Sequence, residues 1–314
     1  MNGIINVIKP PGMTSHQVVG FVRRQLKQRR VGHVGTLDPG ASGVLVVCVG
    51  KATRLSSYLM AGRKTYVAEL TLGVATSTQD ASGRTEAICT DFSVSPEKLA
   101  DAFSQFLGDI AQVPPMVSAV RVDGRRLYER ERRGEEIHRD PRTVRIYELH
   151  INRVLPEKET LTFGSRVLFQ VTCGKGTYIR TLCHDIGSVL GVHGHLSFLS
   201  RISSDPFSVS AGWTLEEIAE ACQTGRHAFL IPMEDGLPNL PRVRVSPLAE
   251  MRVLHGNRVP ADDLVDVPQA LVVGDEVFIM GLEGEVLALA RVVRHTSNNL
   301  ECQPVLVLKE GQPS

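Results

Sequence analysis

Residues 32–45 have the sequence GHVGTLDPGASGVL. Four glycines and one proline within its first twelve positions predict a loop, because these residues interrupt helices and strands. The apolar run at 44–49 that follows predicts a short buried strand. The sequence therefore predicts a glycine-rich loop, ahead of a buried strand, that carries one carboxylate, Asp38.

Asp38 is unusual because of the charges that precede it. Residues 1–37 contain six Lys and Arg residues and no acidic residue. A basic segment is suited to phosphates, which repel carboxylates, so an aspartate at its end indicates a nucleophile or an acid–base group. The alternative is a purely local role, since Asp-Pro-Gly is an ordinary turn sequence.

The charge of the chain is unevenly distributed. Residues 1–210 carry 27 Lys and Arg against 19 Asp and Glu, whereas residues 211–314 carry 8 against 15. Within the basic part, residues 121–145 contain nine Arg and no Lys, which favours contact with phosphates and bases. A solvated helix face of mixed charge is the alternative. We expect the segment 121–145 to act as a thumb that becomes ordered on a polyanion.

Composition and motif searches exclude several classes of protein. With 42% apolar and 22% charged residues the chain is typical of a soluble globular protein, and no apolar run reaches the ~20 residues of a membrane span. No signal-peptide pattern is visible, so we expect a cytoplasmic protein. The six cysteines form no Cys-x-x-Cys pair, and no dinucleotide fingerprint occurs. We therefore expect neither a metal site nor a cofactor.

Periodicity predicts a mixture of helices and strands. Strict alternation over 64–72 predicts a strand, and the turn 174–177 precedes a helix over 178–190 that places Arg180 in its first turns. Arg180 could neutralise a buried carboxylate or lie on the surface. Further predicted elements are a helix capped by Ser15, a helix after Ser95-Pro96, strands at 144–151 and 167–173, and a helix opened by Thr214 and Glu217.

Prolines 238, 241 and 247 mark a linker. Three strand-like runs follow it, at 272–280, 286–293 and 304–308, which predict a small β module. We therefore predict two domains, a main domain over 1–237 and a C-terminal β domain over 238–314.

Five segments in this order resemble one known family, the TruB-type tRNA pseudouridine-55 synthases, over about residues 3–210. Each segment alone is a weak signal, but five segments in the same order are very unlikely to occur by chance. The segments are KPPGMTS at 9–15, the stretch at 32–45, KTY at 64–66 with LG at 72–73 and DASG at 80–83, QVPPMVSAV at 112–120, and GKGTYIRTL at 174–182.

The resemblance implies an α+β fold, with mixed α/β structure around a long central antiparallel sheet, and a PUA-like C-terminal module. It implies that uridine-55 of the tRNA T-loop is flipped out and isomerised to pseudouridine. Asp38 would be catalytic, Tyr66 would stack on the uracil, and Arg180 would pair with Asp38 and keep it ionised. The substrate-binding set would comprise His33, Tyr178, Leu199 and Lys9.

The resemblance further implies the T-arm of tRNA as partner, no membrane, no obligatory protein partner, and a monomer. Ser200 departs from the family pattern, which has Arg there, and the C-terminal module is acidic. Three alternatives stay open: a synthase for another RNA site, a non-catalytic RNA-binding or RNA-folding protein, and an unrelated hydrolase that uses Asp38.

Overall fold

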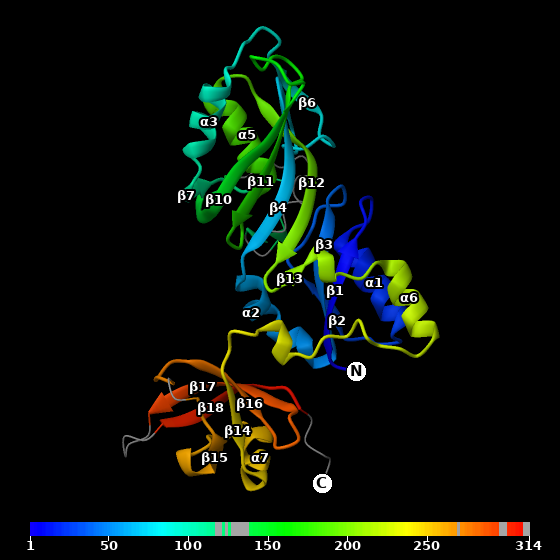
Figure 1. Ribbon diagram of the computed structural model, residues 1–314, viewed down its shortest axis with the longest axis vertical. Helices are drawn as coiled ribbons and strands as arrows, with labels where there is room; N and C mark the ends of the chain where they lie inside the picture. The colour runs from blue at the N-terminus through cyan, green and yellow to red at the C-terminus, as the bar shows by residue number, and fades with distance from the viewer. Residues whose placement is uncertain (117–120, 123–124, 127–137, 269–270, 295–299, 310–314) are drawn as a thin grey trace.

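One long sheet forms the frame of the molecule, which a computed structural model describes for residues 1–116, 121–122, 125–126, 138–268, 271–294 and 300–309 (Figure 1). Its strands follow the order β1-β3-β12-β4-β11-β10-β7, with β2 paired to β3 and β13 to β12. The pairs are antiparallel except for a short parallel contact of β3 with β12. The strands are β1 Gly3–Lys9, β2 Val31–Val34, β3 Ser42–Val49, β4 Lys64–Leu72, β7 Gly108–Gln112, β10 Arg142–Leu155, β11 Arg166–Cys173, β12 Gly194–Ser204 and β13 Phe207–Ser208.

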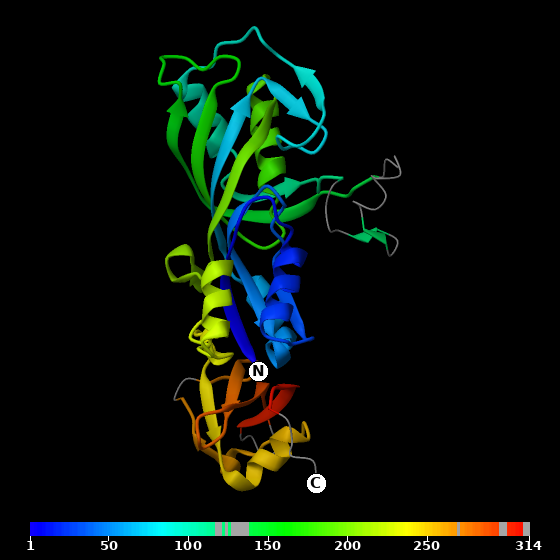
Figure 2. The ribbon, with the colours of Figure 1, turned by 90° about the vertical axis from the view of Figure 1, so that its right-hand side faces the viewer.

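Helices cover one face of this sheet (Figures 1 and 2). Apolar side chains from four of them enter a single core with strand residues such as Leu45, Ala68 and Phe169. The strand β4 illustrates how one face of the sheet enters this core. Its residues alternate between buried and half-buried along its whole length, as its sequence predicts. These four helices are α1 Ser15–Gln25, α3 Pro96–Ser104, α5 Ile179–Leu190 and α6 Leu215–Gln223.

A second sheet occupies the C-terminal part, with strand order β15-β14-β16-β17-β18 (Figure 1). It has an apolar core of its own. The α+β class, with a long and mostly antiparallel sheet and a separate PUA-like β module, is thereby confirmed. The division at 237/238 stays a prediction. The elements are β14 Arg242–Val245, α7 Pro247–Leu254, η4 Ala261–Asp263, β15 Leu264–Asp266, β16 Glu276–Met280, β17 Val286–Arg294 and β18 Leu300–Val307.

The second sheet packs against the main one through a shared apolar cluster. Phe278, Met280 and Leu289 from the C-terminal part meet Val44 and Val46 of β3 there. The opposite side chains of β3 enter the main core, so this strand is buried on both faces. The remaining short elements are η1 Gly50–Leu55, α2 Ser56–Ala61, β5 Val74–Thr76, β6 Thr85–Ile88, β8 Arg121–Val122, β9 Arg125–Arg126, η2 Val209–Ala211 and η3 Glu234–Gly236.

Three local predictions are wrong. The predicted linker between Pro238 and Pro247 contains strand β14, which pairs with β15 and β16 of the second sheet. Ser15 was predicted to cap the helix α1, but the cap is Thr14, whose hydroxyl accepts from the Gln17 amide. Ser15 is already the first residue of the helix and is buried. The predicted loop over 32–43 begins with strand β2, since its first residues pair with β3. Most of the predicted thumb lies outside the described residues. No helix in the part of the chain that the structure describes is long and apolar enough to cross a bilayer.

Candidate active site

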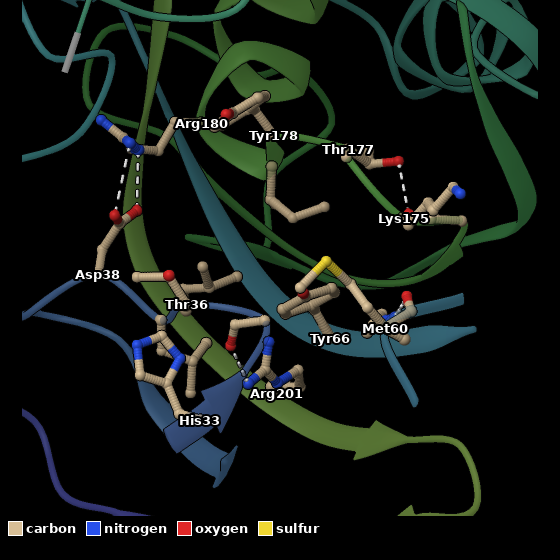
Figure 3. A pocket seen from close by; sticks show the side chains of 17 residues that line it. His33, Thr36, Asp38, Met60, Tyr66, Lys175, Thr177, Tyr178, Arg180 and Arg201 are labelled. Atoms are coloured by element: carbon tan, nitrogen blue, oxygen red, sulfur yellow. Dashed lines mark hydrogen bonds and ion pairs between the residues drawn. The ribbon is translucent and has the colours of Figure 1, made fainter. Parts of the chain in front are cut away.

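A cavity of about 360 Å³ opens where the loop after β2, the strands β4 and β12, and the turn between β11 and α5 meet (Figure 3). This volume is within the usual range of small-molecule sites. Segments far apart in the sequence build its wall, and they include the predicted catalytic residues Asp38, Tyr66 and Arg180. We call it the active-site cavity. Its lining residues are His33, Gly35, Thr36, Leu37, Asp38, Met60, Lys64, Tyr66, Gly174, Lys175, Gly176, Thr177, Tyr178, Ile179, Arg180, Leu199 and Arg201.

Asp38 and Arg180 form an ion pair in this cavity (Figure 3). Arg180 Nε lies 2.9 Å from Asp38 Oδ2, and Nη2 donates to Oδ1 at 3.4 Å. The arginine side chain is 4% exposed, whereas the aspartate side chain keeps 41% exposure toward the cavity. Asp38 also closes a turn, because its carbonyl accepts from the Ala41 amide at 3.1 Å. The backbone thus serves the turn while the carboxylate faces the cavity.

A second carboxylate reaches the same arginine. Asp80 Oδ2 lies 3.6 Å from Arg180 Nη1, and that nitrogen also donates to the Thr78 carbonyl at 3.0 Å. Burial raises the pKa of Asp38, and Asp80 raises it further, while Arg180 lowers it only in part. That Arg180 keeps Asp38 ionised stays a prediction, since the nearby cation favours the charged carboxylate while desolvation and the like charge of Asp80 oppose it.

The loop that carries Asp38 is fixed from behind by the segment at 9–15. Ser15 Oγ donates to the Leu37 carbonyl and accepts from the Leu37 amide. The Gly12 amide donates to the Pro39 carbonyl at 2.8 Å, and Lys9 Nζ donates to the same carbonyl at 3.2 Å. Lys9 is fully buried and lies outside the cavity lining. Lys9 therefore supports the loop from inside the protein and does not line the cavity.

Tyr66 and Arg201 form the floor of the cavity (Figure 3). Arg201 is 1% exposed, and it donates through Nε to the Val44 carbonyl at 2.7 Å and through Nη2 to the Gly35 carbonyl at 2.9 Å. Burial raises the pKa of Tyr66, and a hydrogen bond with Arg201 opposes this. Gly43 permits the close crossing of β3 and β12, since a Cβ there would lie 2.2 Å from the Arg201 carbonyl oxygen.

The other predicted substrate-binding residues lie in the cavity wall. His33, Tyr178 and Leu199 all line it. Burial lowers the pKa of His33, and its Nδ1 is buried without a hydrogen-bond partner among the described residues. The backbone of Tyr178 is held by the buried Gln112 amide, at 3.0 and 3.2 Å. The predicted residues Asp38, Tyr66, Arg180, His33, Tyr178 and Leu199 thus come together, and Lys9 lies behind them.

Lys64 is a cavity residue that sequence reasoning gave no role. Its side chain donates to the carbonyls of Met60 and Gly62, and burial lowers its pKa to about 8. Asp80 appears in the sequence analysis only within the DASG motif, Ser15 only as a motif residue and a predicted helix cap, and Arg201 not at all. No local pattern distinguishes them, because each acts through a partner distant in sequence. No cluster of His, Cys, Asp or Glu in the described ranges could hold a metal ion.

Comparison with known proteins places these features in a family. The model "TruB family pseudouridylate synthase (N terminal domain)" matches residues 23–179. The model "tRNA pseudouridylate synthase B C-terminal domain" matches residues 180–238. The two matches are adjacent and together include Asp38, Tyr66 and Arg180.

Relatives and solved structures are similar over nearly the whole chain. The tRNA pseudouridine synthase B of Moorella thermoacetica is 46% identical and covers 98% of this chain and 99% of its own length. That of Alkaliphilus oremlandii is 42% identical, with 98% of each chain covered. A chain of an H/ACA RNP bound to a substrate RNA containing 2′-deoxyuridine matches with a TM-score of 0.72 at 28% identity, covering 98% and 85%. A chain of the archaeal box H/ACA sRNP Nop10-Cbf5 complex gives 0.71 at 29% identity, covering 98% and 86%. The chain belongs to the TruB family of pseudouridylate synthases.

Proposed function

We propose that this protein isomerises uridine-55 in the T-loop of tRNA to pseudouridine, with Asp38 as the catalytic carboxylate. The observation that carries the proposal is the Asp38–Arg180 ion pair, at 2.9 Å, in a cavity whose floor is the aromatic side chain of Tyr66. A purely structural turn does not require its carboxylate to face a cavity. The family relationship adds the reaction and the substrate class.

The reaction is an isomerisation and balances within the substrate. The bond from ribose C1′ to uracil N1 breaks, the ring turns, and C5 bonds to C1′. A proton leaves C5, and N1 gains one. The Asp38 carboxylate serves this exchange by adding to the ring or by acting at C1′, and both routes need it ionised. Arg180 supports that state, whereas burial and Asp80 oppose it.

The target uridine must leave its loop to reach Asp38, at a cost of a few kcal/mol in lost stacking. Tyr66 offers an aromatic face on the cavity floor. Stacking on such a side chain returns ~1–3 kcal/mol per base. We assign to Tyr66 the role of platform for the flipped uracil, and to His33, Tyr178 and Leu199 that of walls around the nucleotide.

The T-arm of tRNA is the proposed partner, bound by a monomer in the cytoplasm without another protein. Phosphate contacts would come from the basic main part of the chain. The C-terminal module is acidic, and four of its arginines lie within 4.0 Å of carboxylates, which leaves them less charge to offer phosphates. These pairs are Arg242–Asp235, Arg252–Asp263, Arg258–Glu301 and Arg291–Glu276.

Tritium release tests the proposal. Unmodified tRNA transcript labelled at uracil C5 is incubated with the protein, because bonding of C5 to C1′ must release the label into water. We expect release by the wild type, none by Asp38→Asn, and none from a transcript that lacks the T-loop uridine. Asp109→Asn, an exposed ion-paired aspartate, is the control for loss of a carboxylate.

Three results would contradict parts of the proposal. Normal release by Asp38→Asn would remove Asp38 from the chemistry. Release from the transcript without the T-loop uridine would indicate another RNA site. Tight binding with no release would indicate an RNA-binding protein.

A further inference from the structure

A second cavity, of about 550 Å³, adjoins the active-site cavity and shares Asp38 and Leu199 with it. We call it the flanking cavity. Its walls are the loop 39–41 after Asp38, the turn 80–82, and the segment 196–199 of β12. The turn is fastened to β12, because the Ala81 amide donates to the Leu196 carbonyl at 2.9 Å. The flanking cavity is thus built from the same fixed elements as the active site.

A bulge in β12 turns an aromatic side chain outward at this cavity. The pairing of β12 with β4 shifts between Leu196, opposite Leu70, and Phe198, opposite Glu69. As a result Leu196 and Leu199 are both buried, while the Phe198 side chain between them is 47% exposed. Bulges next to active sites commonly re-aim side chains in this way. The result is a phenylalanine ring at the rim of a cavity.

The charges of the flanking cavity offer no cation to a phosphate. Its charged lining residues are the carboxylates Asp38 and Asp80, and none of its described lining residues is Lys or Arg. The active-site cavity is the opposite case, with Lys64, Lys175 and two arginines in its lining. Asp80 is held inside the protein, because its Oδ1 accepts from Thr78 and Ser82 and its Oδ2 lies 3.6 Å from Arg180. The remaining surface, aliphatic walls with an exposed aromatic ring, suits an uncharged planar group.

We infer that the flanking cavity binds the base of a nucleotide adjacent to the target uridine, with Phe198 as its stacking surface. The inference rests on the proposed function, since a uridine held at Asp38 brings its sequence neighbours to the shared boundary of the two cavities. A nucleobase is planar and uncharged, and its face can stack on the exposed ring of Phe198. The site would recognise the loop at a second base and hold the backbone in its flipped form.

The test combines protein and RNA changes. The RNAs are a T-arm stem-loop and two versions that are abasic at the nucleotide 5′ or 3′ of the target. The proteins are wild type, Phe198→Ala, Phe198→Tyr and Phe163→Ala. Phe163 is a matched control, because its side chain is also 47% exposed and it lies outside the flanking-cavity lining. The Kd for each RNA and the rate of tritium release are measured separately.

We expect Phe198→Ala to weaken binding of the intact stem-loop roughly tenfold, as for loss of one stacked base. Phe198→Tyr should bind like wild type. On one of the two abasic RNAs the effect of Phe198→Ala should disappear, because that RNA has no base to stack, and this RNA identifies the bound neighbour.

An equal loss on all three RNAs, or a loss no larger than that of Phe163→Ala, would overturn the inference. Absence of tritium release by the wild type would contradict the proposed function alone, since the Kd comparison still decides whether a base occupies the cavity.

Discussion

Ser15 holds Leu37 by two hydrogen bonds, one to each side of its peptide group. The serine Oγ donates to the Leu37 carbonyl at 3.0 Å and accepts from the Leu37 amide at 2.9 Å. Both residues are buried. Because Leu37 immediately precedes Asp38, this contact fixes the backbone from which the carboxylate projects. A helix residue outside the cavity lining thereby positions the proposed catalytic carboxylate.

Ser15→Ala should therefore lower both stability and turnover. Leaving two buried backbone groups unpaired costs about 1–3 kcal/mol for each group in the free energy of unfolding. A looser loop also lowers kcat more than it raises KM. Thr14→Ala is the matched control, since it removes the cap of the same helix, at ~1 kcal/mol, without touching Leu37. Denaturant unfolding and tritium-release kinetics measure both effects. An equal loss of kcat in the two variants would show that the clamp has no specific role.

The pH dependence of the reaction should reflect the raised pKa of Asp38. The carboxylate must be ionised, so kcat/KM falls as pH decreases through this pKa, above the usual range of an aspartate. Asp80→Asn removes one of the charges that raise it and should move the acid limb to lower pH. The pH profiles of wild type, Asp80→Asn and Asp109→Asn test this. An acid limb unmoved by Asp80→Asn would contradict the coupling through Arg180.

Stability should depend on Lys64 between pH 8 and 10.5. Burial lowers its pKa from 10.5 to about 8, so in this window the unfolded chain holds a proton that the folded protein has released. Unfolding then takes up a proton, and rising pH favours the folded state. The unfolding free energy of the wild type should therefore rise relative to that of Lys64→Met as the pH increases across the window. A difference for Lys64→Met that does not change with pH would refute the expectation.

Tyr66→Ala should reduce turnover more than tRNA affinity. The stack forms only after the uridine has left its loop, whereas most of the affinity comes from phosphate contacts made beforehand. We expect a loss of kcat with a Kd within a few-fold of wild type, measured by single-turnover release and by filter binding. Equal losses of rate and affinity would make Tyr66 a general binding residue instead.

Local sequence patterns predicted the elements whose own residues determine them. The alternation of β4 is visible in its sequence because one face is buried along its entire length. Ser15 was misread as a helix cap because Thr14 and Ser15 are chemically equivalent candidates. Their roles are separated only by the contact with Leu37, 22 positions away. The same holds for β2, which is a strand because β3 lies beside it.

The site was predicted from resemblance rather than from local pattern. The pairing of Asp38 with Arg180 spans 142 positions, and no spacing rule connects them. The resemblance predicted the pair but not the raised pKa of Asp38, because that pKa also depends on burial and on the charge of Asp80. It also grouped Lys9 with the substrate-binding residues, although that side chain supports the loop from inside the protein.

The strand β3 supplies side chains to two cores, with Val44 and Val46 packed toward Phe278 and Leu289 of the C-terminal part. The C-terminal module is therefore the cover of a hydrophobic surface on the catalytic part. Removing it would expose the back of the strand that follows the Asp38 loop, so a truncated enzyme would be prone to aggregate. The two parts should also melt together in one calorimetric transition, because neither can unfold without exposing apolar side chains of the other.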